Sequence, residues 1–275
     1  MNQPHESLSR RIKAVVFDLD GTILKNDKTF SPRTVKMIRA LERSGIIPII
    51  ATGRCRNSAR SYQRTLDLST PLICCNGACV TEEPSGKELL HVHLEDAVCR
   101  ELVALSREFD VHLHAYMNER LYFEQGSKEA DTHDLEAQHV GITVDFDQIP
   151  NLECTKVMCI GNEDRLDKIH RQLRDTYHDK LLMVYTYFNY FEVMDKRAGK
   201  RQALEFVLNR LGITREETMA FGDAENDKDM ITWVSYGVAM GNAPEDVRSA
   251  APFRADTNEQ DGAARFVEEF FSLKL

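Results

Sequence analysis

The sequence lacks any apolar run long enough to cross a bilayer, so we expect no membrane span. Its polar start, which ends in Arg10 and Arg11, also lacks the apolar stretch of a signal peptide. Hydrophobic residues make up 42% of the 275 residues and charged residues 29%. This composition is typical of globular proteins that bury a sizeable core.

Positive charge is scarce relative to negative charge. The chain has 35 Lys and Arg against 44 Asp and Glu, and its formal net charge is -9. Because nucleic acids are bound mainly through Lys and Arg that neutralise phosphates, we expect no nucleic-acid partner. A small anionic substrate stays possible, since a metal ion and a lysine can invert the sign of the field in one pocket.

The seven cysteines include no CxxC pair, and their number is odd. Neither a zinc ribbon nor the disulfide framework of a small secreted protein is therefore expected. Reduced thiols in a cytoplasmic protein fit this pattern best.

Apolar strands alternate with helices in the first part of the chain. The strand predicted at residues 13–19 is followed by a helix that Ser31 and Pro32 begin and Gly45 ends, and then by strands at 46–51 and 71–75. This alternation predicts a parallel sheet with right-handed crossovers, and hence an α/β, Rossmann-like core. The same rhythm returns with a helix at 200–211 and strands at 218–221 and 237–240.

Between these two parts the pattern changes to strands with unlike faces. It predicts an α+β insert at 84–195 within an α/β core formed by 1–83 and 196–275. In the insert we expect strands at 89–94, 111–123, 142–146, 156–160 and 182–194, with helices at 96–109 and 163–177.

Four polar clusters stand at or just beyond the ends of predicted core elements. They are Asp18 with Asp20, Thr52-Gly53-Arg54, Lys200, and Asp223 with Asn226 and Asp227. The carboxyl ends of parallel strands share one edge of a sheet, so these clusters can meet around one ligand. Carboxylates without His or Cys suit Mg²⁺, which takes oxygen ligands and shares a bound phosphate.

These clusters resemble the signatures of haloacid dehalogenase-type phosphatases. Asp18 to Thr22 matches the DxDGT signature, Thr52 the second, Lys200 the third, and the GDAEND run that ends at Asp227 the fourth. Further runs resemble the Cof-type subfamily and its bacterial sugar-phosphate phosphatases, namely NGA at 76–78, VAMGNA at 238–243 and EVMDKRAGK at 192–200. Arg201 departs from the glycine that the family often has after the lysine.

The resemblance implies that Asp18 is the nucleophile and that Asp20 is the general acid and base. For that task we expect the Asp20 pKa to be raised by its acidic neighbours. Asp18, the Asp20 carbonyl and Asp223 would bind Mg²⁺, with Asp227 orienting that shell. The phosphoryl oxygens would be held by Thr52, Lys200, Asn226, Arg54 and the backbone N–H groups of Leu19 and Gly53.

We therefore predict a Mg²⁺-dependent phosphatase that hydrolyses small phosphate monoesters, above all sugar phosphates, through an aspartyl-phosphate. The insert would be a type-two cap that selects the substrate. Two alternatives remain at this point: a phosphosugar mutase, and a phosphosugar-binding regulator that lost turnover. For His112, His114 and Tyr116, which alternate along one predicted strand, a substrate contact and an ordinary exposed sheet face are both open. No oligomeric state is predicted.

Overall fold

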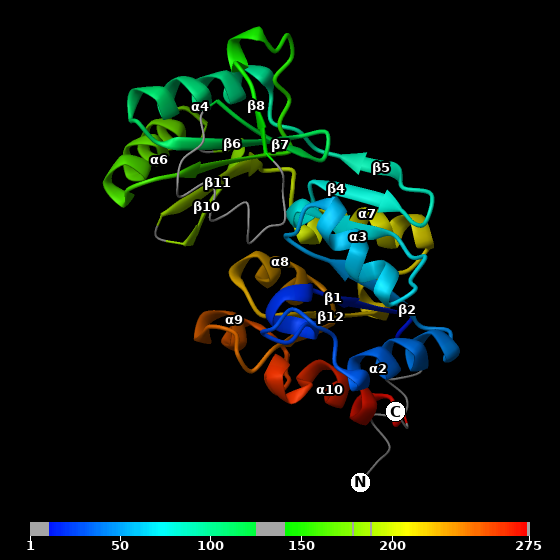
Figure 1. Ribbon diagram of the computed structural model, residues 1–275. Coiled ribbons are helices and arrows are strands. Elements are labelled where there is room, and N and C mark those ends of the chain that lie inside the picture. Colours follow the sequence, from blue (N-terminus) through cyan, green and yellow to red (C-terminus); the bar gives the residue numbers. More distant parts are fainter. Residues whose placement is uncertain (1–10, 125–140, 178, 188, 274–275) are drawn as a thin grey trace. The chain divides into compact units, whose positions relative to one another are not determined.

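A computed structural model describes residues 11–124, 141–177, 179–187 and 189–273 (Figure 1). The described chain divides into two compact units. The first comprises the residues up to Arg54, Ala59–Leu90 and the residues from Gly199 onward. The second comprises Cys55–Ser58 and His91–Ala198.

The first unit is built on an eight-stranded sheet with β1 (Ala14–Phe17) near its centre. β1 pairs in parallel with β12 (Thr218–Gly222) on one side and with β2 (Ile47–Ala51) on the other. The strand order is β14-β13-β12-β1-β2-β3-β4-β5. The remaining strands are β3 (Leu72–Cys74), β4 (Cys79–Glu82), β5 (Lys87–His91), β13 (Tyr236–Ala239) and β14 (Phe253–Arg254).

Helices cover both faces of this sheet because successive strand residues point to opposite sides. Val16 and Ala220 pack with α7 (Lys200–Leu211) and α8 (Glu225–Trp233) in one core. On the other face Phe17 stacks on Phe221, which meets Phe266 of α10 (Gly262–Phe270) edge to face. Beside α10 lies α2 (Pro32–Arg43) (Figure 1), where the Ser31 hydroxyl accepts a hydrogen bond from the Thr34 N–H. The unit also contains α9 (Glu245–Ala250) and most of α3 (Arg56–Thr65).

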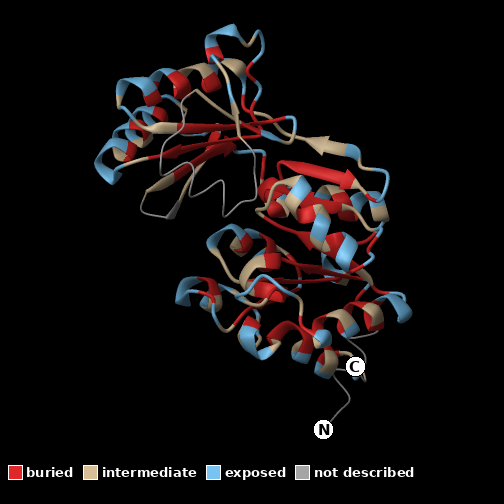
Figure 2. Cartoon of the chain, viewed as in Figure 1, coloured by how far each residue is buried: buried red, intermediate tan, exposed pale blue. Residues whose placement is uncertain are grey.

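The second unit is built on a six-stranded, mainly antiparallel sheet in the order β10-β11-β9-β6-β7-β8. Helices α4 (Asp96–Glu108) and α6 (Glu163–Tyr177) pack their apolar sides on it, and Figure 2 shows the buried and exposed stripes of both helices. The strands are β6 (His112–Met117), β7 (Arg120–Phe123), β8 (Ile142–Thr143), β9 (Lys156–Ile160), β10 (Leu181–Tyr187) and β11 (Tyr190–Asp195).

The predicted fold class, an α/β parallel-sheet core with an α+β insert, is confirmed, but several predicted strands were wrong in detail. The predicted strand 111–123 is a hairpin, because Asn118 and Glu119 turn the chain with φ of 48° and 64°. The run 182–194 is also two antiparallel strands, β10 and β11. The strand predicted at 89–94 is β5, which belongs to the first sheet rather than to the second. After the first turn the apolar alternation resumes in the same phase at Leu121, so periodicity alone did not show that break.

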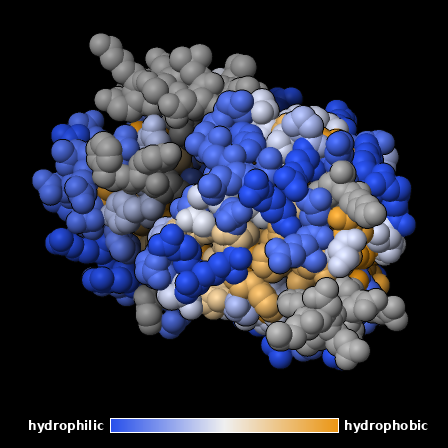
Figure 3. Space-filling view, turned by 90° about the horizontal axis from the view of Figure 1, so that it is seen from below, coloured by the Kyte–Doolittle hydropathy of each residue, from blue (hydrophilic) through white to orange (hydrophobic). Residues whose placement is uncertain are grey.

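Among the described residues, no helix is long and apolar enough to span a membrane. The start of the chain up to residue 10 lies outside those residues. Hydrophilic residues cover most of the face shown in Figure 3, and apolar residues gather in a smaller area.

A buried ion pair joins two strands of the second sheet. Lys156 on β9 donates to Glu192 on β11 across 2.9 Å, and both side chains are nearly enclosed. The Lys156 ammonium also lies 4.7 Å from the ring centroid of Tyr116 on β6. Burial alone would lower the pKa of Lys156, but the Glu192 carboxylate outweighs burial and the net shift is upward. Each charge thus depends on the other for its solvation.

Removing one member of this pair should destabilise the second unit far more than removing both. Lys156→Met leaves Glu192 buried without its cation, which should lower the free energy of unfolding by about 3 to 5 kcal/mol. The double variant Lys156→Met/Glu192→Leu should recover most of that loss. As a control, Arg171→Met breaks an exposed pair with Asp167 and should change stability by less than about 1 kcal/mol. Thermal unfolding measures all three, and a double variant no more stable than Lys156→Met would contradict the prediction.

Candidate active site

The predicted site residues of the core follow the ends of adjacent parallel strands. β1 leads into Asp18 and the single turn Leu19–Ile23, β2 leads into Thr52, and β12 ends at Gly222 before Asp223. Since β12, β1 and β2 are neighbours in the sheet, these residues come to one edge. Lys200 is the first residue of α7, which packs on the same sheet.

Lys200 lies at the centre of a buried cluster of acids. Its ammonium donates to Asp18 Oδ1 at 2.7 Å and to Asp227 Oδ1 at 2.6 Å. Asp18, Asp223 and Asp227 each offer an oxygen within 4.8 Å of the others. Lys200 is only 2% exposed and Asp18 only 5%. One positive charge is therefore enclosed with three acidic groups, away from the screening of bulk water.

Several short contacts hold Asp223 and Asp227 in place. Asp227 Oδ2 accepts the backbone N–H groups of Asp223 and Ala224, both at 3.1 Å, while its Oδ1 accepts from Lys200. Asp223 accepts from the Thr22 hydroxyl at 3.0 Å and from Asn242 Nδ2 at 3.2 Å. With both oxygens engaged, Asp227 is suited to orienting its neighbours.

Gly21 allows the turn after Asp18 to approach Asp223 closely. Its φ is +74°, a backbone conformation that residues other than glycine rarely adopt. A Cβ at this position would lie 2.2 Å from Asp223 Oδ2. Any larger residue would therefore displace Asp223 or the turn.

Burial and mutual repulsion favour protonated acids in this cluster. The pKa of Asp18 is raised far above its ordinary value by burial and by Asp227 and Asp223, although Lys200 opposes the shift. The pKa of Asp223 is raised to about 6 by burial and by Asp227. Burial would lower the pKa of Lys200, but Asp18 and Asp227 outweigh it, so its pKa is raised and it stays charged.

This charge balance tests whether the cluster suits a metal ion. The donors of Asp18, Asp223 and Asp227 are carboxylate oxygens, and a single lysine does not balance three negative charges. Hard divalent cations prefer oxygen ligands and would supply the missing positive charge. The residues therefore fit such an ion, while zinc-type nitrogen and sulfur ligands are not part of this cluster.

A second set of contacts surrounds Thr52 and Gly53. The Thr52 hydroxyl is buried and accepts the Arg54 N–H at 3.1 Å. Asn226, at the start of α8, donates from Nδ2 to Asn76 Oδ1 at 2.7 Å. A Cβ on Gly53 would lie 2.8 Å from that same Asn76 oxygen, so glycine permits the approach. Thr52, Gly53 and Asn226 are thus brought together through Asn76.

Asp20 does not have the electrostatic environment that we predicted. Arg54 donates hydrogen bonds to both of its carboxylate oxygens, from Nε at 2.6 Å and from Nη2 at 2.8 Å. Lys28 donates to Oδ1 at 2.9 Å. Partial burial would raise the Asp20 pKa, but the hydrogen bonds and charges of Arg54 and Lys28 outweigh it and the pKa is lowered. The expectation that acidic neighbours raise it was wrong, because two cations bind this carboxylate directly.

Sequence reasoning missed four residues that support the site: Thr22, Lys28, Asn76 and Asn242. Three of them stand in the runs that resemble known signatures, but no role was assigned to them. Asn242 joins the Gly21 carbonyl at 2.8 Å to Asp223, and Asn76 orients Asn226. Lys28 stands outside every signature, so only the folded turn shows that it reaches Asp20.

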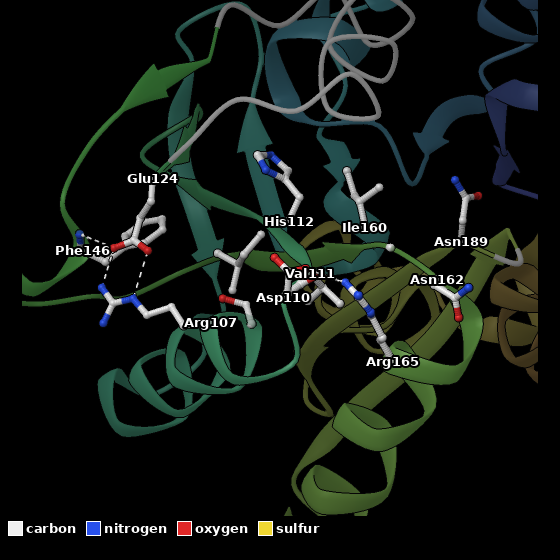
Figure 4. A pocket seen from close by; sticks show the side chains of 13 residues that line it. Arg107, Asp110, Val111, His112, Glu124, Phe146, Ile160, Asn162, Arg165 and Asn189 are labelled. Atoms are coloured by element: carbon white, nitrogen blue, oxygen red, sulfur yellow. Dashed lines mark hydrogen bonds and ion pairs between the residues drawn. The ribbon is translucent and has the colours of Figure 1, made fainter.

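A separate cavity of about 640 Å³ lies wholly in the second unit (Figure 4). Its two arginines are already paired, Arg107 with Glu124 and Asp147 and Arg165 with Asp110. His112 lines this cavity. The cluster around Lys200, not this cavity, therefore has the acids and the lysine that phosphate chemistry requires.

The strand that contains His112, His114 and Tyr116 is not an ordinary exposed sheet face. His114 and Tyr116 are 0% and 6% exposed. Arg197 differs from these residues because it is exposed. Its Nε and Nη2 each donate a hydrogen bond of 2.9 Å to the Asp195 carboxylate.

Comparison with known proteins shows which family has this site. Residues 15–267 match the family of haloacid dehalogenase-like hydrolases. The 5-amino-6-(5-phospho-D-ribitylamino)uracil phosphatase YitU of Bacillus subtilis is 32% identical over 94% of this chain and 97% of its own length. The HMP-PP phosphatase of Serratia proteamaculans is 29% identical over 87% of this chain and 88% of its own. A haloacid dehalogenase-like hydrolase from Bacteroides thetaiotaomicron has a matching structure, with a TM-score of 0.86, 25% identity, and coverage of 94% and 100%.

The chain belongs to the family of haloacid dehalogenase-like hydrolases. The prediction of this family from four short signatures is confirmed.

The raised acid pKa values predict how pH affects the metal-free protein. A carboxyl whose folded pKa is raised stabilises the fold below its unfolded pKa, and this stabilisation is lost as pH rises through the folded pKa. For Asp223 the loss is complete once the pH exceeds about 6, and for Asp18 once it exceeds about 8. Metal-free protein should therefore lose stability between about pH 4 and about pH 8.

Asp18→Asn, which has no proton to lose, should be more stable than the wild type in chelator. We expect its Tm to exceed the wild-type Tm by roughly 2 to 8 °C at about pH 8, with a smaller difference at about pH 5. Asp229→Asn, a change at an exposed carboxylate, should show no such pH-dependent gain. A difference for Asp18→Asn that is equal at both pH values would contradict the electrostatic account.

Proposed function

We propose that this protein hydrolyses small, soluble phosphate monoesters with Mg²⁺, and that Asp18 is its nucleophile. The observation that supports this most directly is the buried contact of Asp18 with Lys200 beside Asp223 and Asp227. The relatives YitU and the HMP-PP phosphatase are phosphatases by name. This chain is a phosphoric monoester hydrolase.

The first chemical step transfers the phosphoryl group to the protein. An Asp18 carboxylate oxygen attacks phosphorus, the ester P–O bond breaks, and the leaving oxygen takes a proton from Asp20. Asp20 must be protonated for this step, against the pKa-lowering contacts of Arg54 and Lys28 in the structure. The second step is hydrolysis of the aspartyl-phosphate: Asp20 accepts a proton from water, whose oxygen attacks phosphorus. Inorganic phosphate leaves and the Asp18 carboxylate is restored.

Mg²⁺ would be held by Asp18, Asp223 and the Asp20 carbonyl, with Asp227 orienting the first two acids. When bound, it would neutralise the phosphate and reduce its repulsion from Asp18. Lys200 contributes a fixed positive charge in contact with Asp18, and its raised pKa keeps that charge at all physiological pH values.

The transferring oxygens would be held by groups around Thr52. The Thr52 hydroxyl, Asn226 and Lys200 are side-chain donors, and the N–H groups of Leu19 and Gly53 add backbone donors. Arg54 adds a positive charge at the rim, where it now binds Asp20. Such preoriented donors stabilise the charge that develops in the transition state.

The substrate class follows from the relatives and from the division of the chain. Both relatives are phosphatases by name, and the substrate named for YitU carries a phosphoribityl group. The acid–lysine cluster belongs to residues 1–83 and 196–275, which we propose as the catalytic core. We propose that residues 84–195 select the leaving group, and that sugar phosphates and similar small esters are preferred over phosphopeptides.

A phosphate-release screen tests this function. The purified protein should release phosphate from sugar phosphates, nucleotides or flavin mononucleotide with Mg²⁺, and excess chelator should abolish release. Asp223→Ala should raise the Mg²⁺ concentration needed for half-maximal rate by about 10-fold or more. Isomerised sugar phosphate without free phosphate would indicate a mutase instead, and full activity in chelator would contradict the metal assignment.

Loss of the nucleophile tests the mechanism. Asp18→Asn keeps the shape and hydrogen bonding of the side chain but removes its nucleophilicity, so kcat should fall by about 10⁴-fold or more. Asp229→Asn, which alters an exposed acid on α8, should keep the wild-type rate. Phosphate release by Asp18→Asn within about tenfold of the wild-type rate would contradict the assignment.

A further inference from the structure

The Arg54 guanidinium is held from two sides. On one side it binds both carboxylate oxygens of Asp20, through Nε and Nη2. On the other side its central carbon lies 4.7 Å from the ring centroid of Tyr62 on α3. Phe30 meets the Tyr62 ring edge to face, with centroids 5.8 Å apart. These contacts form a continuous chain from Phe30 through Tyr62 and Arg54 to Asp20.

This chain limits the motion of a side chain that is otherwise flexible. An arginine loses considerable rotamer freedom when it is fixed, and its two parallel hydrogen bonds to a carboxylate require one orientation of the guanidinium plane. An aromatic ring against that plane favours the orientation electrostatically and by contact. Tyr62 thereby stabilises the orientation in which Arg54 donates both hydrogen bonds to Asp20.

Tyr62 contributes little to the core of its own helix. The buried residues of α3 are Ala59 and Gln63, whereas Tyr62 is only partly buried. A partly buried ring can be shortened without opening a cavity in the core. Its contact with Arg54 therefore gives it a role that packing of α3 does not require.

We propose that Tyr62 is a positioning residue that acts through Arg54 to orient the Asp20 carboxyl toward the leaving-group oxygen. The proposal rests on the function proposed above, in which Asp20 gives its proton to that oxygen as the ester P–O bond breaks. Tyr62 touches neither the phosphate nor the metal ligands in this role. It fixes the direction from which Asp20 acts.

The expected signature depends on the leaving group. An alkoxide leaves only with a proton, whereas p-nitrophenolate needs little protonation, so faulty Asp20 orientation harms sugar phosphates most. Tyr62→Leu should lower kcat for glucose 6-phosphate by about 3- to 30-fold, the range expected for loss of one cation–π contact. With p-nitrophenyl phosphate the loss should stay below about twofold. Tyr62→Phe, which keeps the ring, should retain most of the rate with both substrates.

A double-variant cycle separates positioning from general stability. Once Arg54→Met has removed the guanidinium, adding Tyr62→Leu should lower kcat for glucose 6-phosphate by less than about twofold. Lys168→Met, which removes a cation 5.8 Å from the Phe109 ring in the second unit, is the matched control and should not alter the ratio of the two substrates.

The outcomes separate this proposal from the function on which it rests. If the wild-type protein hydrolyses neither substrate, the proposed function fails and the role of Tyr62 fails with it. Two results would overturn only the positioning role in a wild type that hydrolyses both substrates. Tyr62→Leu could lower both rates equally, or it could lower kcat for glucose 6-phosphate as much in the Arg54→Met background as in the wild type. A substrate-selective loss that disappears in the Arg54→Met background supports it.

Discussion

The site depends on one lysine ammonium enclosed with three carboxyl groups. Lys200 contacts Asp18 and Asp227 directly, and Asp223 lies beside them, all in a region where water screens little charge. Such a group of acids is costly to ionise, as the raised pKa values of Asp18 and Asp223 indicate. A bound proton or a divalent cation relieves the repulsion, and only the cation leaves Asp18 free to attack phosphorus. The repulsion between buried carboxylates that destabilises the metal-free fold is thus also what favours binding of the cation in the proposed chemistry.

The architecture of the first unit makes this enclosure possible. Adjacent parallel strands β12, β1 and β2 end at one edge, and α7 brings Lys200 there from a distant part of the sequence. Gly21 lets the turn after Asp18 close against Asp223, and Asn242 joins the two. Two further sets of hydrogen bonds lie around this centre. One links Thr52, Asn76 and Asn226, and the other joins Arg54 to Asp20. Each contact fixes a polar group that would otherwise be mobile.

Much of this could be predicted from the sequence because strand ends and acidic signatures are local patterns. Asp18, Thr52 and Asp223 each follow a short apolar run, so the parallel sheet and the cluster at its edge were both expected. The Asn118-Glu119 turn was missed because the apolar alternation resumes in the same phase at Leu121 beyond it. The Asp20 pKa was predicted in the wrong direction, since neither Lys28 nor the orientation of Arg54 can be read from spacing. The contacts of Asn76 with Asn226 and of Asn242 with Gly21 join residues 150 and 221 positions apart, which no local pattern encodes.

Calorimetric titration of the metal-free protein with Mg²⁺, in two buffers of different ionisation enthalpy, measures whether the acids around Lys200 carry protons that the metal displaces. If burial keeps protons on the acids around Lys200, metal binding must displace them. The account predicts that Mg²⁺ binds with measurable proton release at neutral pH, and that both binding and release weaken in Asp223→Ala. Binding without proton release, or proton release unchanged by Asp223→Ala, would contradict it.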